Sequence, residues 1–211
     1  CRQAIDICDQ FGDARGAAIA RVNLSMLGLY RADWKTALEE AELGISLAMQ
    51  IGARRFESDC MCYKAEALAA LGDRNQAEQV VDAVYQINLE MGLSYCGPII
   101  LGLMAMIVDD TEKRLWALSE GERLLTGDCV SHNYLMFYRF GIEAALSEGN
   151  WDLAARYADA LEVYTKAESL PWSDYFIAWG RALSEHGRGQ RGSDLLEQLR
   201  SLKKKAEGFG M

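Results

Sequence analysis

Short polar elbows divide the chain at an almost constant spacing, and this spacing limits the folds that it can adopt. The elbows are centred on Asp33, Asp73, Asp110, Asn150 and Gln190, at intervals of 40, 37, 40 and 40 residues. The stretches between them carry apolar residues at helical spacing. A fixed period of this length is typical of helical repeats, in which each helix pair buries its apolar face against the next pair. The period predicts an all-α chain, an α-solenoid of consecutive helix hairpins.

The segment AEALAALGDRNQAEQVV, residues 65–81, contains the clearest elbow. Gly72 can adopt the left-handed conformation that ends a helix. Asp73 or Asn75 can accept hydrogen bonds from the free N–H groups that open the next helix. We therefore expect two antiparallel helices joined by a tight turn.

Small side chains recur at two positions of the repeat, as close packing of a helix on its partner requires. The position in the first helix is occupied by Ser25, Ala65, Gly102, Ile142 and Ala182. The position four residues after the elbow is occupied by Ala37, Ala77, Arg114, Ala154 and Asp194. The departures at Arg114 and Asp194 predict a distorted or shortened third hairpin and a more polar terminal one. Trp34 and Trp151 follow their elbow residues directly, and we expect them to pack over the elbows.

We expect one helical-repeat domain over residues 1–211, with helix pairs at residues 13–52, 53–92, 93–127, 128–168 and 169–211. Residues 1–12 are interpreted as a truncated leading helix that Gly12 closes, the second helix of an upstream pair. No methionine precedes Cys1, so we interpret the chain as a piece of a longer protein. A leading helix without its partner would expose an apolar edge, through which a homodimer could form.

The composition argues against several classes of protein. The formal net charge is -9, and nucleic-acid binding needs a basic face that is not visible here. The most apolar run, residues 99–108, is too short to span a bilayer, and no signal peptide precedes it. These features predict a cytoplasmic protein that binds neither nucleic acid nor a membrane.

No cluster of residues predicts catalysis or metal binding. The six cysteines contain no Cys-x-x-Cys pair, and the two histidines lie far apart in the sequence, so we expect no metal and no cofactor. No Gly-x-x-x-x-Gly-Lys-Ser/Thr loop is present to hold phosphates. Glu143 and Glu148 are too far apart on a helix to act together, and Asp109 and Asp110 lie at an elbow where Asp caps a helix. We do not expect this chain to be an enzyme.

A partner-binding groove is the candidate functional site. If the first helices of the hairpins line the inner surface, the repeat positions place a mixed set of charged, aromatic and sulfur-containing side chains near a groove: Asp59, Cys62, Glu66, Cys96, Met106, Arg139, Glu143, Trp179 and His186. Such a surface could hold a peptide or a partner helix. The alternative is that Met106 and Trp179 belong to the core and the charged residues form a solvated face.

The order of small residue, Gly-Asp or Gly-Asn elbow and alanine resembles the tetratricopeptide repeat, although most aromatic residues of its first helix are missing. The resemblance implies a right-handed superhelix. Two segments, AEALAALGDRNQAEQVVDAVYQINLEMG and EGNWDLAARYADALEVYTKAESLPWSDYFIAWGRALSEHGRG, are similar to the C-terminal repeats of bacterial multidomain class III adenylate/guanylate cyclases. In that family a cyclase domain and a P-loop ATPase module precede such repeats. The catalytic parts are not recognisable in this sequence.

The resemblance implies a non-catalytic domain for protein–protein interaction and regulation in a bacterial signalling protein. Its partner would be a protein, a peptide or another domain of the same chain. One alternative is the effector-sensing repeat domain of a large ATPase-type transcription activator. A helical-repeat enzyme is the second alternative.

Overall fold

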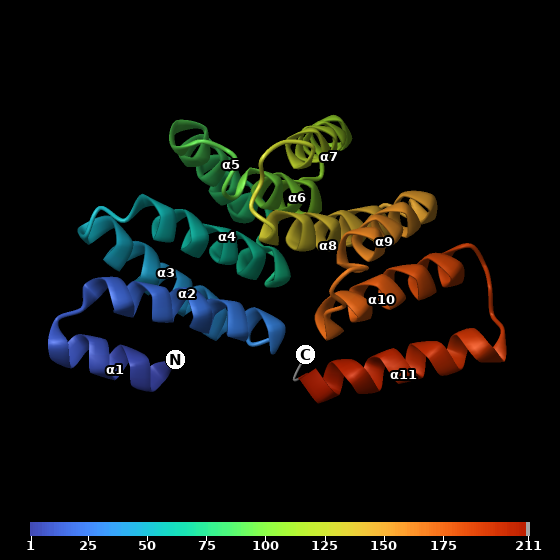
Figure 1. Cartoon of the computed structure of the whole chain (residues 1–211), viewed down its shortest axis with the longest axis horizontal. Helices are drawn as coiled ribbons and strands as arrows, with labels where there is room; N and C mark the ends of the chain where they lie inside the picture. Colours follow the sequence, from blue (N-terminus) through green and yellow to red (C-terminus); the bar gives the residue numbers. More distant parts are fainter. Residues whose placement is uncertain (210–211) are drawn as a thin grey trace. The chain divides into compact units, whose positions relative to one another are not determined.

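In the computed structural model, which describes residues 1–209, every regular element is an α-helix (Figure 1). The helices in this range are α1 (Arg2–Phe11), α2 (Ala14–Tyr30), α3 (Trp34–Gln50), α4 (Arg54–Ala70), α5 (Arg74–Met91), α6 (Gly97–Ile107), α7 (Thr111–Leu125), α8 (His132–Ser147), α9 (Trp151–Thr165), α10 (Pro171–Gly187) and α11 (Ser193–Phe209). The predicted all-α class is confirmed.

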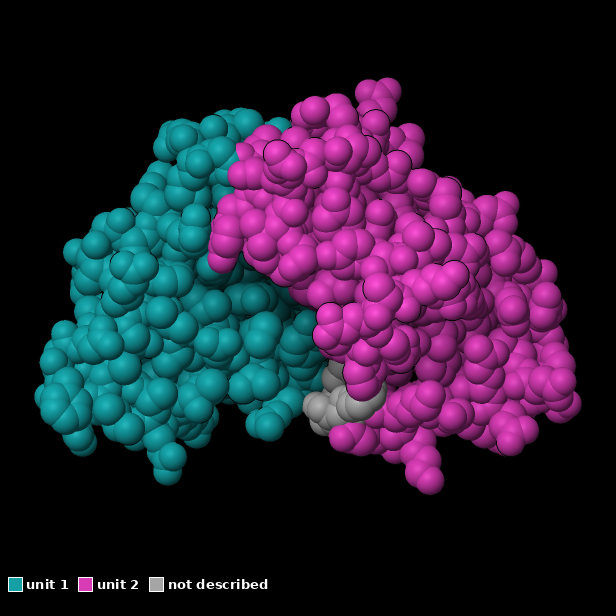
Figure 2. All heavy atoms as spheres, in the orientation of Figure 1, with its two compact units in different colours: residues 1–92 teal, residues 93–211 magenta. Residues whose placement is uncertain are grey.

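The chain divides into two compact units, unit 1 with residues 1–92 and unit 2 with residues 93–211 (Figure 2). Unit 1 contains α1 to α5, and unit 2 contains α6 to α11. Within each unit every helix packs on the one that follows it. The first helices of neighbouring hairpins also pack together, α2 on α4 in unit 1, and α6 on α8 and α8 on α10 in unit 2. This consecutive packing is consistent with an α-solenoid.

Four of the five periodic elbow residues cap the helix that follows them. Their side-chain oxygen accepts a hydrogen bond from the backbone N–H three residues later, at 3.3 Å for Asp33, 3.2 Å for Asp73, 2.8 Å for Asp110 and 3.1 Å for Asn150. Each cap satisfies an N–H group that has no partner inside its helix. The sequence period is therefore a period of helix starts.

The residue before the cap takes the left-handed conformation at three of these elbows. It is Gly72 with φ 91° in the second hairpin and Gly149 with φ 68° in the fourth. The first hairpin has Ala32 there, with φ 54°, a conformation that strains a residue with a Cβ atom.

The small residues bring paired helices close together. Ser25 is fully buried in α2, and its hydroxyl donates a 2.7 Å hydrogen bond to the carbonyl of Ala37 in α3. A Cβ atom on Gly28 would lie 2.9 Å from the backbone nitrogen of Ala37. The two tryptophans pack at their elbows, because Trp34 contacts the cluster around Leu29 and a Cβ atom on the elbow residue Gly149 would lie 3.5 Å from the ring of Trp151.

The third hairpin differs, as the arginine at its alanine position predicts. Its first helix, α6, has 11 residues, whereas α2 and α4 each have 17. Arg114 is buried against the end of α6, where its Nε donates to the carbonyl of Ala105 at 3.1 Å and one Nη donates to the carbonyl of Val108. Its other Nη lies 3.0 Å from a carboxylate oxygen of Glu148.

Two features are absent from the described part of the chain, residues 1–209. None of its helices combines the length and the apolar character needed to cross a bilayer. Nor does this part bring three or more His, Cys, Asp or Glu side chains together in an arrangement that could hold a metal ion.

Candidate functional site

The nine predicted groove residues lie in both units, three of them on α4 of unit 1. Cys62 and Glu66 are buried there, and Asp59 is half-buried. Cys60 lies between them in sequence and is fully buried, and this burial raises the pKa of its thiol to about 12. A thiol of that pKa stays protonated near neutral pH, so Cys60 is a small core side chain and not a nucleophile.

In unit 2, two predicted residues form an ion pair on α8. Nε of Arg139 donates to a carboxylate oxygen of Glu143 at 2.8 Å, one helical turn away. The guanidinium carbon of Arg139 lies 4.6 Å from the ring centroid of Phe140 and 5.6 Å from that of Phe176 on α10. These distances are within the range of cation–π attraction. The arginine therefore joins α8 to α10 and is held in place from three directions.

Aromatic residues of α10 continue this surface. The ring of Phe176 contacts Tyr175 and Trp179 edge to face, with centroids 5.2 and 6.1 Å apart. Burial raises the pKa of the Tyr175 phenol, and the negative charge of Glu143 raises it further. Tyr175 and Trp179 also pack against the buried leucines of α11 around Leu195, so they are partly core and partly surface. We call Arg139, Glu143, Tyr175 and Trp179 the α8–α10 face.

The other predicted residues of unit 2 lie elsewhere. Met106 is half-buried on α6, and His186 is exposed near the end of α10. Cys96 is 5% exposed at the start of α6, with its Sγ 3.9 Å from Nε2 of His132. Burial lowers the pKa of His132, and the edge of its ring faces Tyr95. The thiol of Cys96 is therefore buried beside an imidazole.

Two aromatic residues were not among the predicted groove residues. They are Tyr175, which belongs to the α8–α10 face, and Phe176, whose ring joins Tyr175 and Trp179 to Arg139. Both precede Trp179 at helical spacing, three and four residues away, so their position on one side of a helix could be read from the sequence. Their contact with Arg139 depends on how α8 packs on α10, and no local pattern gives that information.

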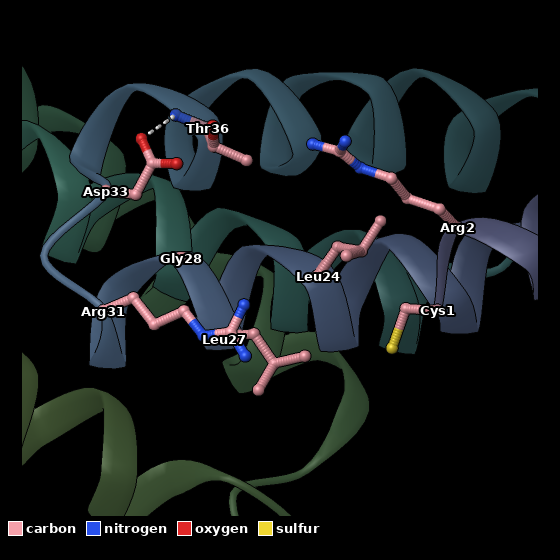
Figure 3. Close-up of a pocket in the computed structure, with 8 residues that line it drawn as sticks. All are labelled: Cys1, Arg2, Leu24, Leu27, Gly28, Arg31, Asp33 and Thr36. Atoms are coloured by element: carbon pink, nitrogen blue, oxygen red, sulfur yellow. Dashed lines mark hydrogen bonds between the residues drawn. The ribbon is translucent and has the colours of Figure 1, made fainter. Parts of the chain in front are cut away.

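Unit 1 contains a pocket of about 480 Å³ between the start of α1, the second half of α2 and the elbow before α3 (Figure 3). It is lined by Cys1, Arg2, Leu24, Leu27, Gly28, Arg31, Asp33 and Thr36. Its volume lies within the usual range for sites of small molecules. This pocket could not be predicted from a local sequence pattern, because its lining includes residues as far apart in the sequence as Arg2 and Asp33.

Comparisons of the chain with protein-family models, with curated proteins and with solved structures find no match.

Proposed function

We propose that the chain is a non-catalytic, protein-binding repeat region that regulates a larger signalling protein, and that the α8–α10 face of unit 2 contacts the partner. The observation that carries the proposal is the contact of Arg139 on α8 with Phe176 on α10, whose ring also contacts Tyr175 and Trp179. Arginine, tyrosine and tryptophan contribute most of the binding energy in many protein interfaces.

The geometry of this face supports a protein ligand. The Arg139 and Glu143 side chains keep 12% and 23% of their surface exposed, so their charges can still be reached from solvent. Their ion pair and the contacts of Arg139 with the rings of Phe140 and Phe176 hold them in one arrangement, which lowers the entropy lost on binding. A partner helix or extended segment could place an apolar side chain against the rings and a polar group against the ion pair.

The resemblance of the sequence to a known repeat supports two more specific assignments, the type of repeat and the type of parent protein. We propose that the hairpins are of the tetratricopeptide type with a right-handed twist, and that the chain functions in the cytoplasm. The parent protein would be a bacterial adenylate/guanylate cyclase whose catalytic arrangement the repeats bias. The periodic caps at Asp33, Asp73, Asp110 and Asn150 support the repeat assignment. The two quoted segments support the cyclase assignment.

The first test is capture of binding proteins from an extract of the source organism on three immobilised versions of the chain. These are the wild type, the variant R139A/E143A, and the control R181A/E162A. The control removes an arginine and a glutamate that also form an ion pair, at 2.7 Å between α9 and α10. Both variants therefore change the charge equally, but only the first changes the α8–α10 face.

We expect a protein that binds the wild type and the control and is lost from R139A/E143A. Circular dichroism and thermal unfolding would establish that the variant is folded. Glu143→Gln is a second variant, which removes the negative charge beside Arg139 and adds no like charge to repel the arginine from the rings. If all folded versions captured the same proteins equally well, the proposal that the α8–α10 face contacts the partner would be wrong.

A further inference from the structure

The pocket of unit 1 has a charge unlike that of the chain around it. Arg2 and Arg31 contribute two positive charges to its lining and Asp33 one negative charge, in a chain with a formal net charge of -9. The excess positive charge favours an anionic ligand.

The two arginines are not used to hold the fold together. Elsewhere in unit 1, Arg21 pairs with Glu40 at 2.7 Å and Arg54 pairs with Glu57 at 3.0 Å. In the described part of the chain, the guanidinium groups of Arg2 and Arg31 form no ion pair and no hydrogen bond, and the positive charge of Arg2 acts on Asp33 only over a longer distance. Each guanidinium carries five N–H donors, and their fork matches a carboxylate or phosphate group.

Asp33 offsets one of the two positive charges, but its carboxylate is already engaged in the fold. Its carboxylate is the cap of α3 and accepts a hydrogen bond from the backbone N–H of Thr36 at 3.3 Å (dashed in Figure 3). Hydrogen bonds from Thr36 are the main cause that lowers the pKa of Asp33, with a smaller contribution from the charge of Arg2. The aspartate thus has a structural partner, whereas the two arginines do not.

The rest of the lining is suited to an apolar group. Figure 3 shows Arg2 extending toward Thr36 and Arg31 folding back along α2 toward Leu27, with Leu24 between them. Gly28 adds no side chain to the lining, and it is a glycine because Ala37 packs against it. Two leucines and a bare helix surface can contact a small branched hydrocarbon group.

We propose that this pocket binds a small organic anion, with its carboxylate or phosphate head held by Arg2 and Arg31 and its branched apolar body on Leu24 and Leu27. This proposal goes beyond the proposed protein binding, and it concerns the other unit. Each can fail without the other.

The test is a titration of the ¹⁵N-labelled chain, followed through the backbone amide signals of Gly28 and Thr36. The probes are 4-methylpentanoate, 3-methylbutyl phosphate, acetate and 4-methylpentan-1-ol. The first two combine an anionic head with a branched body, and the last two each lack one part. The variants are Arg2→Gln and Arg31→Gln. The control is Arg200→Gln, which removes an exposed arginine of α11 in the other unit.

We expect saturable shifts with one or both complete probes at up to about 50 mM, since a dissociation constant of this size requires a binding free energy of only about 2 kcal/mol. The tighter of the two identifies the head group. Acetate and the alcohol should bind at least about fivefold more weakly, and each pocket variant should weaken binding of the complete probe by about tenfold, the lower end of what a hydrogen bond to a charged group contributes. The control should change nothing.

Two results would overturn the proposal. One is the absence of saturable shifts at Gly28 and Thr36 with both complete probes. The other is equal weakening by the pocket variants and by Arg200→Gln, which would indicate a general effect of charge.

Discussion

In the α4–α5 hairpin the last carbonyl groups of the first helix accept hydrogen bonds from the backbone, whereas in the α6–α7 hairpin they accept them from a side chain. The backbone turns back at Gly72, so that its N–H and that of Asp73 reach the carbonyls of Ala69 and Leu68 at 3.1 and 2.9 Å. No glycine follows α6. The chain leaves the helix at Val108 in an extended conformation, and Arg114 donates to the carbonyls of Ala105 and Val108.

The difference shows why one repeat position tolerates two such different residues. Ala77 is completely buried between helices whose carbonyl groups already have partners. Arg114 occupies the matching position beside a shorter helix whose end needs donors. The residue at this position is determined by how the preceding helix ends, and exchanging the two residues tests this explanation.

Ala77→Arg should give the largest effect. The substitution would force a long side chain into a closed interface and bury a charge without a carboxylate, at a cost of about 4 kcal/mol or more. Urea denaturation followed by circular dichroism measures the free energy of unfolding. A loss below about 1 kcal/mol would mean that the second hairpin can adopt the arrangement of the third.

Arg114→Met should destabilise the chain by about 3 kcal/mol, because it leaves buried carbonyl groups at the end of α6 without donors. Amide hydrogen exchange should increase in the last turn of α6 and not in α4. The matched change Glu148→Gln should cost less than Arg114→Met, since the carboxylate is 43% exposed, so that water can reach the Nη that it pairs with, and the two carbonyl bonds stay in place. If the two variants were equally destabilised, the ion pair and not the capping would be the important contact.

Asp73→Ala should lower stability by about 1 kcal/mol, the usual cost of losing a helix cap. Asp110→Ala should cost the same, because both side chains accept one hydrogen bond from the N–H three residues later. Thermal unfolding of the two variants checks this equality. A much larger loss for Asp110 would show that the starts of the two second helices differ as much as the ends of the first helices.

Ala32→Gly should give the smallest effect and raise stability by about 0.5 to 1 kcal/mol. Ala32 has φ 54° at the elbow position that Gly72 and Gly149 occupy in other hairpins, and glycine adopts this conformation without a Cβ penalty. The reverse change, Gly72→Ala, should lower stability by a similar amount. The thermal unfolding midpoints of both variants measure these two effects. A loss of stability in Ala32→Gly would contradict the explanation that Ala32 is strained.

The fold was largely predictable from local signals. Cap residues at a regular spacing located the helix starts, and Arg114 identified the irregular hairpin. The sequence contained no comparable signal for the division after Gly92 into two units.

The α8–α10 face was only partly predictable. Helical spacing places Tyr175 beside Trp179, but the contact of Arg139 with Phe176 arises from packing between separate helices.

The pocket of unit 1 could not be predicted at all. Arg2 and Arg31 lie far apart in the sequence, and each one alone is an ordinary exposed arginine. Only the packing of α1 on α2 places both on one pocket.

The central claim is that the α8–α10 face binds a protein, and the most direct measurement is the affinity of a captured partner by isothermal titration calorimetry. The account predicts that R139A/E143A binds at least about tenfold more weakly than the wild type, as expected when central interface residues are truncated. The control R181A/E162A should bind within about twofold of the wild type, because exposed pairs away from an interface contribute little. Equal affinities for all three proteins, or equal losses in both variants, would contradict the claim.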